Sequence, residues 1–253
     1  MENININGGR AFLNGVSIHS NVGYSKVIYK DGQYYIKSAP VSSNNKKGKF
    51  INILNKIPFL RAFCLIYSIF KRNTKSILKI TFIYISIIVL SFSFMSDNMV
   101  SKVNSNENIF LIFLLFLIFF IIKILPISNY HGAEHMVINY YKENKELNIT
   151  KLKNASRVST KCGSVLIMLT ITVFLFLNIF IPSPDIAFIL GFMIGYEIFE
   201  NEFKFFQPIV LLSGIIQKYL LTSKPNSKQL KAAILALENS IKSIPGVDSL
   251  KYH

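Results

Sequence analysis

Long apolar runs constrain what this 253-residue chain can fold into more than any other feature of its sequence. Three of them, Ile77–Met95, Ile109–Ile127 and Ser164–Ile181, have 18 or 19 residues each. A helix needs roughly 20 residues to cross a hydrocarbon core of about 30 Å. A fourth run, Ile186–Phe199, contains Glu197 and extends to about Phe203. The pattern therefore predicts about four transmembrane helices.

The composition excludes several other classes of protein. Hydrophobic residues make up 51% of the chain and charged residues only 16%, which excludes a disordered chain. Two cysteines cannot staple a small disulfide scaffold of this length. The net charge of +15 comes from 28 basic residues, of which 24 are lysine. Since base recognition favours the bidentate contacts of arginine, we expect no nucleic-acid partner.

The basic residues orient the predicted helices. Residues 1–76 hold 12 of them, residues 128–162 hold six and residues 200–253 hold seven, whereas the two other loops hold one in all. Lysine and arginine collect on the cytoplasmic side of membrane proteins. We therefore predict a multi-pass protein of the cell membrane, partnered by the lipid bilayer, with both termini cytoplasmic. Cys64 and Cys162 then face a reducing compartment, and no disulfide is expected.

The regions outside the predicted spans are β-rich at the amino end and helical at the carboxy end. Tyr24–Tyr29 and Gln33–Ile36 flank Lys30-Asp31-Gly32, and an Asp-Gly pair between β-prone runs predicts a hairpin. Ser227 can cap an amphipathic helix that runs to about Ser243. The expected fold is a mainly α membrane protein with a small cytoplasmic β-rich amino-terminal region and a carboxy-terminal amphipathic helix. Its expected parts are residues 1–50 (β-rich), 51–76 (an interfacial amphipathic helix that includes Pro58–Phe70), 77–203 (four membrane helices with the cytoplasmic loop 128–162) and 204–253 (an interfacial or re-entrant segment at 208–221, then the last helix).

Two of the four histidines lie in the sequence His131-Gly132-Ala133-Glu134-His135. Residues i and i+4 share one face of a helix, so both imidazoles can reach one ion. Glu134 lies beside them and is a candidate general base, as in the inverted zinc-peptidase signature. The alternative is that both histidines bind lipid headgroups at a helix end.

Cys162 and Glu197 are further candidate metal ligands, because the predicted topology brings both to the cytoplasmic face of the membrane. Glu197 would lie inside the fourth span, where an ionisable residue suggests function; the alternative is a carboxylate paired with Lys123 or Arg157. Two histidines with a carboxylate or a thiolate suit a divalent metal, above all zinc. An open position would indicate catalysis, and four protein ligands a structural site.

Short motifs in a fixed order also resemble those of a known family. They are Gly8-Gly9-Arg10-Ala11 with Gly15-Val16, Ile57-Pro58 with Arg61, His131–His135 with Ile138-Asn139, Ser156-Arg157 with Lys161-Cys162-Gly163-Ser164, Tyr196-Glu197, Gln217-Lys218 and Lys224-Pro225. In these motifs the chain resembles the YqhQ-like family of bacterial multi-pass membrane proteins. The family's function is not established, and the resemblance implies a multi-pass fold and a metal-dependent enzyme.

The chain departs from the family pattern at three places. Asn14 stands where the family typically has a glutamate, Ser159-Thr160 where it has His-Pro, and Met136 where it has a lysine. A member that has lost such groups can keep a metal without turnover.

Two functions follow from the sequence as competing hypotheses. The first is a metallohydrolase in which zinc is held by His131 and His135 with Glu197 or Cys162, and Glu134 is the base. The second is a non-catalytic membrane scaffold or adaptor that binds a membrane or cytoplasmic protein partner. A transporter is a weaker third hypothesis, because the four predicted helices show no inverted repeats, which many transporter folds contain.

Overall fold

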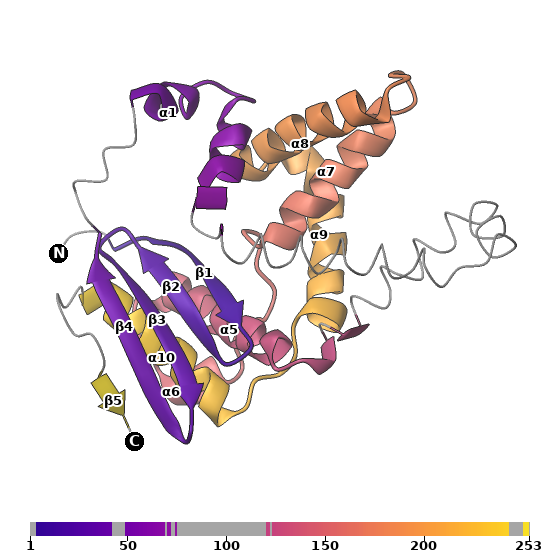
Figure 1. Cartoon of the computed structure of the whole chain (residues 1–253). Coiled ribbons are helices and arrows are strands. Elements are labelled where there is room, and N and C mark those ends of the chain that lie inside the picture. Colours follow the sequence, from indigo (N-terminus) through magenta and orange to yellow (C-terminus); the bar gives the residue numbers. More distant parts are fainter. Residues whose placement is uncertain are drawn as a thin grey trace, which may run out of the picture. The chain divides into compact units, whose positions relative to one another are not determined.

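The computed structural model describes residues 4–41, 49–68, 70–71, 74, 120–121, 123–242 and 250–252. These residues belong to two compact units. The first unit combines residues 1–46, 119–169 and 201–253, and the second combines residues 47–118 and 170–200. The elements appear along the chain in Figure 1.

The first unit is built on an antiparallel sheet whose strands follow one another in chain order. Its strands are β1 (Ile6–Phe12), β2 (Gly15–Ser20), β3 (Gly23–Lys30), β4 (Gln33–Pro40) and the short β5 (Leu250–Tyr252). Between β3 and β4, Asp31 and Gly32 have positive φ angles of 51° and 79°, as a two-residue hairpin turn requires. The hairpin predicted around Lys30-Asp31-Gly32 is therefore confirmed.

Two helices, α5 (Ile127–Asn144) and α10 (Ser227–Lys242), pack with the sheet into one hydrophobic core (Figure 1). Val16, Ile18 and Val27 of the sheet are fully buried, as are Ala133 of α5 and Leu237 of α10. Strands expose alternate residues to each face, so a single row of apolar positions is enough to bind both helices. The predicted helix at 227–243 is confirmed, with its apolar stripe turned to this core.

The last turns of α10 lie directly on the sheet. The Ser20 hydroxyl donates to the carbonyl oxygen of Ser240 at 2.7 Å. A Cβ atom on Gly23 would lie only 2.8 Å from that same oxygen. A side chain at position 23 would therefore push α10 away from β3.

The second unit contains residues 170–177 of α7 (Gly163–Leu177) and most of α8 (Pro184–Asn201). Glycines allow the two helix backbones to approach closely: a Cβ on Gly191 would lie 3.0 Å from Phe174 Cα, and one on Gly195 would lie 2.9 Å from Thr170 N. The remaining part of the unit includes α1 (Lys49–Leu54) and a helical stretch at 61–68. Residues 55–60 are turns rather than helix, so the helix predicted over Pro58–Phe70 begins later than expected.

The prediction of a mainly α protein with four transmembrane helices is wrong. The described residues form an α/β arrangement, and within them no helix has both the length and the apolar character that a membrane crossing needs. Helix α7 ends at Leu177, so the apolar run to Ile181 yields only 15 helical residues, about 22 Å at 1.5 Å per residue. Helix α8 has 18 residues but carries Asp185, Glu197 and Glu200. The predicted span at 77–95, and residues 109–119 of the second, lie outside the described residues.

The run at 208–221 forms α9 (Gln207–Ile216), preceded by a 3-10 turn, η1 (Lys204–Phe206), and followed by a π-helical turn, η2 (Gln217–Leu221). The short helix α6 (Ile149–Leu152) precedes the segment that leads to α7. Both features belong to the first unit and bear on the site described next.

Candidate metal site

Helix α5 carries the two histidines of the His-Gly-Ala-Glu-His sequence. It begins after Pro126 and ends at Lys145, which is in the left-handed conformation, a usual way to terminate a helix. The spacing of four residues stacks His131 and His135 on the same face, with ring centroids 4.4 Å apart. His135 is buried and His131 is half-buried. The sequence prediction that both imidazoles share a helix face is confirmed.

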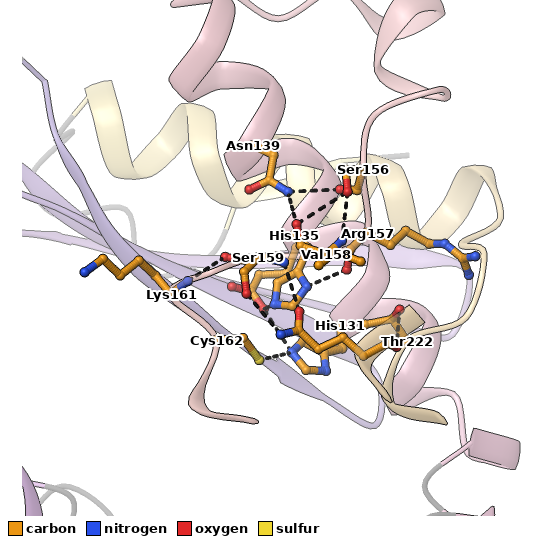
Figure 2. Close-up of polar contacts among 12 residues, drawn as sticks. His131, His135, Asn139, Ser156, Arg157, Val158, Ser159, Lys161, Cys162 and Thr222 are labelled. Carbon is orange, nitrogen blue, oxygen red and sulfur yellow. Dashed lines mark hydrogen bonds and ion pairs between the residues drawn. The ribbon is translucent and has the colours of Figure 1, made fainter. Parts of the chain in front are cut away.

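Cys162 joins this pair from a segment that is distant in the sequence. It lies immediately before α7, and its Sγ atom is 3.6 Å from His131 Nε2 (Figure 2). One ligand atom from each of His131, His135 and Cys162 lies within 4.8 Å of the others. The fold therefore brings together three of the predicted ligands, which could hold one metal ion.

Backbone carbonyls fix the orientation of the imidazoles. His135 Nδ1 lies 2.7 Å from the carbonyl oxygen of Arg157, so the protonated Nδ1 donates and the lone pair of Nε2 is available. His131 forms a hydrogen bond with the backbone of Leu221. Hydrogen bonds of this kind set the tautomer of histidines that bind metals.

The segment that leads to Cys162 is held by two amide side chains. The Asn139 Nδ2 group donates to the carbonyl oxygens of Ser156 and Val158 at 3.1 and 2.7 Å. Gln217 accepts from the Ser159 N–H at 2.9 Å and donates to the Ser159 carbonyl at 3.0 Å. Figure 2 shows Asn139 beside Ser156 and Val158, close to the histidine pair.

Sequence reasoning gave neither amide a role, although both occur in the motifs of the resemblance. Gln217 is fully buried and lies in a π-helical turn. Such turns are frequent at functional sites, and a glutamine among apolar residues with a partner 58 positions away is visible only in the folded chain.

Glu134 lies between the histidines. Its Oε2 atom is 4.0 Å from the Nε2 atom of His131 and 4.0 Å from that of His135. The other side of the carboxylate is covered by β1, because a Cβ on Gly9 would lie 2.5 Å from Glu134 Oε1. A glycine at position 9 is therefore required for the carboxylate to occupy this place.

Burial dominates the protonation of the cluster. It raises the pKa of Glu134 to about 8 and lowers the pKa of His135 to about 3, the latter with help from the nearby charge of His131. Burial also lowers the pKa of His131 and raises the pKa of the Cys162 thiol. Near neutral pH the two imidazoles are consequently neutral, which is the form that binds metals.

Glu197 belongs to the second unit, where it forms an ion pair. Its Oε1 atom accepts hydrogen bonds from Arg61 Nε at 2.7 Å and from the Phe59 N–H at 2.8 Å. Because Arg61 compensates its charge, burial at this position does not require a metal. Its observed partner is Arg61, which belongs to the same unit. Whether Glu197 binds a metal stays a prediction.

Two further observations concern an acidic residue after α8 and the two cysteines. Glu202 forms an ion pair with Lys161 at 2.7 Å. Cys64 and Cys162 are both free thiols.

Comparison with known proteins identifies related sequences. The model of a family described as "Protein of unknown function (DUF1385)" matches residues 75–243, about two thirds of the chain. The chain is also 31% identical over 123 residues to the "Uncharacterized protein YqhQ" of Bacillus subtilis (strain 168), which covers 43% of this chain. That match spans 38% of the relative's length. No solved structure matches the chain.

Proposed function

We propose that this chain, which belongs to the DUF1385 family of proteins of unknown function, binds a divalent metal and uses it for hydrolysis. The observation that carries the proposal is the convergence of His131, His135 and Cys162, whose ligand atoms lie within 4.8 Å of one another. Two of these residues come from one helix and the third from the start of another.

The donor set fits zinc best. Imidazole nitrogens and a thiolate are the ligands that zinc prefers in proteins, and zinc is commonly four-coordinate. The hydrogen bond between His135 Nδ1 and the Arg157 carbonyl is the outer contact that metal-binding histidines usually make. The buried cysteine would bind as the thiolate, which the metal's charge favours over the thiol.

Three protein ligands leave one position for water, as in catalytic zinc sites. A divalent ion supplies Lewis acidity there, which lowers the pKa of a bound water molecule. Glu134 is protonated near neutral pH in the metal-free protein, and the charge of a bound divalent ion would favour its ionised form. The chain would then place a proton acceptor at this position. Glu134 has its carboxylate 4.0 Å from both Nε2 atoms and is held there by Gly9.

A second candidate is a closed, structural metal site in a non-catalytic scaffold. Its supporting observation is that Glu134 is buried beneath β1 and lies at the same distance from both histidines. In that case Glu134 would be the fourth ligand, and the site would hold α5 to the segment before α7. The absence of a histidine at position 159 agrees with this candidate.

Elemental analysis of the purified full-length protein tests metal binding. We expect stoichiometric zinc in the wild type and loss of zinc in a His131→Ala/His135→Ala variant. His19→Ala is a matched control, because His19 lies in β2 and stacks on Tyr24. Equal metal content in wild type and double variant, with circular dichroism unchanged, would refute the proposal.

Glu134→Gln separates the two candidates. If Glu134 is a base, the variant keeps its zinc, and hydrolysis of an activated ester such as p-nitrophenyl acetate falls by about 10²–10⁴-fold. If Glu134 is the fourth ligand, the zinc affinity falls in the same variant. Full metal content with unchanged ester hydrolysis would exclude both roles.

A further inference from the structure

We propose that Arg157 and Lys123 form a subsite for a phosphate group next to the metal site. As a statement about substrate chemistry, this rests on the proposed function, because it gives the hydrolase a phosphate-containing substrate. Binding of the phosphate itself needs only the two cations and can be measured without metal.

Arg157 is anchored beside the metal site by both its backbone and its side chain. Its carbonyl oxygen lies 2.7 Å from His135 Nδ1. The stem of its side chain covers Gly132, since a Cβ there would lie 3.4 Å from Arg157 Cδ. Figure 2 shows the rest of the side chain extending away from His131 and Cys162. The guanidinium group is therefore held at the edge of the site rather than among the ligands.

Lys123 is brought to the same region by the segment that follows η2. Its Nζ atom donates to the Thr222 carbonyl oxygen at 2.6 Å. The next residue, Ser223, lies against Gly132, where a Cβ would be 2.3 Å from the Ser223 carbonyl oxygen. Gly132 thus allows the Arg157 stem and the Lys123-bound segment to lie on the same part of α5.

The two positive charges have no negative partner in the described part of the chain. The ion pairs found there involve other residues. Burial lowers the pKa of Lys123, and the charge of Arg157 lowers it further. Two neighbouring cations without a counter-charge are unfavourable, and a divalent metal nearby would add to the positive potential. An anion relieves this repulsion.

Charge matching favours a phosphate over a carboxylate. A phosphate monoester carries about −1.5 to −2 charges at neutral pH and offers three acceptor oxygens. It can therefore compensate both cations and accept from a guanidinium and an ammonium at once. A carboxylate would compensate only one of the two charges.

Calorimetric titration of inorganic phosphate into the metal-free, full-length protein tests the subsite. We expect saturable binding that weakens with added salt, and about tenfold weaker binding in Arg157→Gln and in Lys123→Gln. Lys153→Gln is the matched control, because Lys153 is exposed on the same unit. Acetate at the same concentration should not compete. Equal competition by acetate would contradict the assignment to phosphate.

A second arm distinguishes a lipid headgroup from a free phosphoester. The same variants are tested for binding to phosphatidylcholine vesicles with and without phosphatidic acid. Binding of soluble phosphate supports a free phosphoester, and binding confined to phosphatidic acid vesicles, weakened by Arg157→Gln, supports a headgroup. Binding of neither probe, or equal binding by wild type and both variants, overturns the proposal. Phosphate binding is measured on the metal-free protein, so it does not depend on whether elemental analysis finds zinc. A failure of this proposal can therefore be told apart from a failure of the proposed metal site.

Discussion

Replacing Gly9 by alanine tests whether β1 holds Glu134 in the metal site. The new Cβ would lie 2.5, 2.7 and 2.8 Å from the Oε1, Cγ and Cδ atoms of Glu134. Gly9 of the edge strand β1 pairs with Ile18 of β2, so moving β1 away from Glu134 would disturb that pairing. The φ angle of Gly9 is not positive, so the substitution causes this contact without straining the backbone.

The expected cost is that of overpacking, about 1–3 kcal/mol of unfolding free energy. The assay is urea unfolding of the metal-free protein, followed by circular dichroism. Gly163→Ala is the matched control, because a Cβ at that position meets nothing within 4 Å. We expect the control to lie within about 0.5 kcal/mol of the wild type.

A double-mutant cycle makes the test specific. Glu134→Ala removes the three atoms nearest to the new Cβ, so Gly9→Ala should cost much less in that background. The predicted coupling is therefore about 1–3 kcal/mol. An equal cost of Gly9→Ala with and without the Glu134 side chain would refute the reasoning.

Two further predictions concern the protonation of the cluster and the support of its cysteine. Burial raises the pKa of Glu134 to about 8 from an unfolded value of 4.5, so its contribution to stability is present below pH 4.5 and is lost as the pH rises to about 8. The pKa of His135 is lowered to about 3 from 6.5, so its contribution is lost as the pH falls from 6.5 to about 3. The free energy of unfolding of the metal-free protein, measured from pH 4 to 9, should decline above pH 6.5 in the wild type and should not decline there in Glu134→Gln. A decline that persists in the variant would contradict this. Gln217→Ala leaves the Ser159 N–H without its partner, at about 1–3 kcal/mol, while the Ser159 carbonyl keeps its hydrogen bond from the Cys162 N–H. The variant should weaken zinc binding through Cys162 by more than tenfold in a chelator competition, whereas an unchanged zinc affinity would show that Gln217 supports only the fold.

The elements with local signals could be predicted from the sequence. The turn at Asp31 and Gly32 requires positive φ angles, and an Asp-Gly pair is typical of such turns. Helix α10 has a regular apolar stripe, although its cap is Asn226, whose Oδ1 atom accepts from the Gln229 N–H at 3.0 Å, and not the Ser227 suggested by the sequence. The histidine pair depends only on the period of one helix. Such features need no knowledge of distant contacts.

Features set by distant contacts were beyond the reach of local patterns. Hydropathy counts apolar residues but does not show that α7 stops at Leu177. The buried charge of Glu197 suggested function, yet Arg61, 136 positions away, compensates it. The placement of Cys162 beside His131 was expected from a topology that the fold does not share, so its confirmation rests on the structure alone. The predicted membrane localisation and protein partners stay predictions.

The absorption spectrum of the cobalt-substituted protein tests the central claim most directly. A thiolate ligand gives intense sulfur-to-cobalt charge-transfer bands, which nitrogen and oxygen ligands do not. The chain has two cysteines, so Cys64→Ser is a matched control for Cys162→Ser. We predict that the band is present in the wild type and in Cys64→Ser and absent in Cys162→Ser. A cobalt-loaded wild type without the band, or a band that survives in Cys162→Ser, would contradict a site formed by His131, His135 and Cys162.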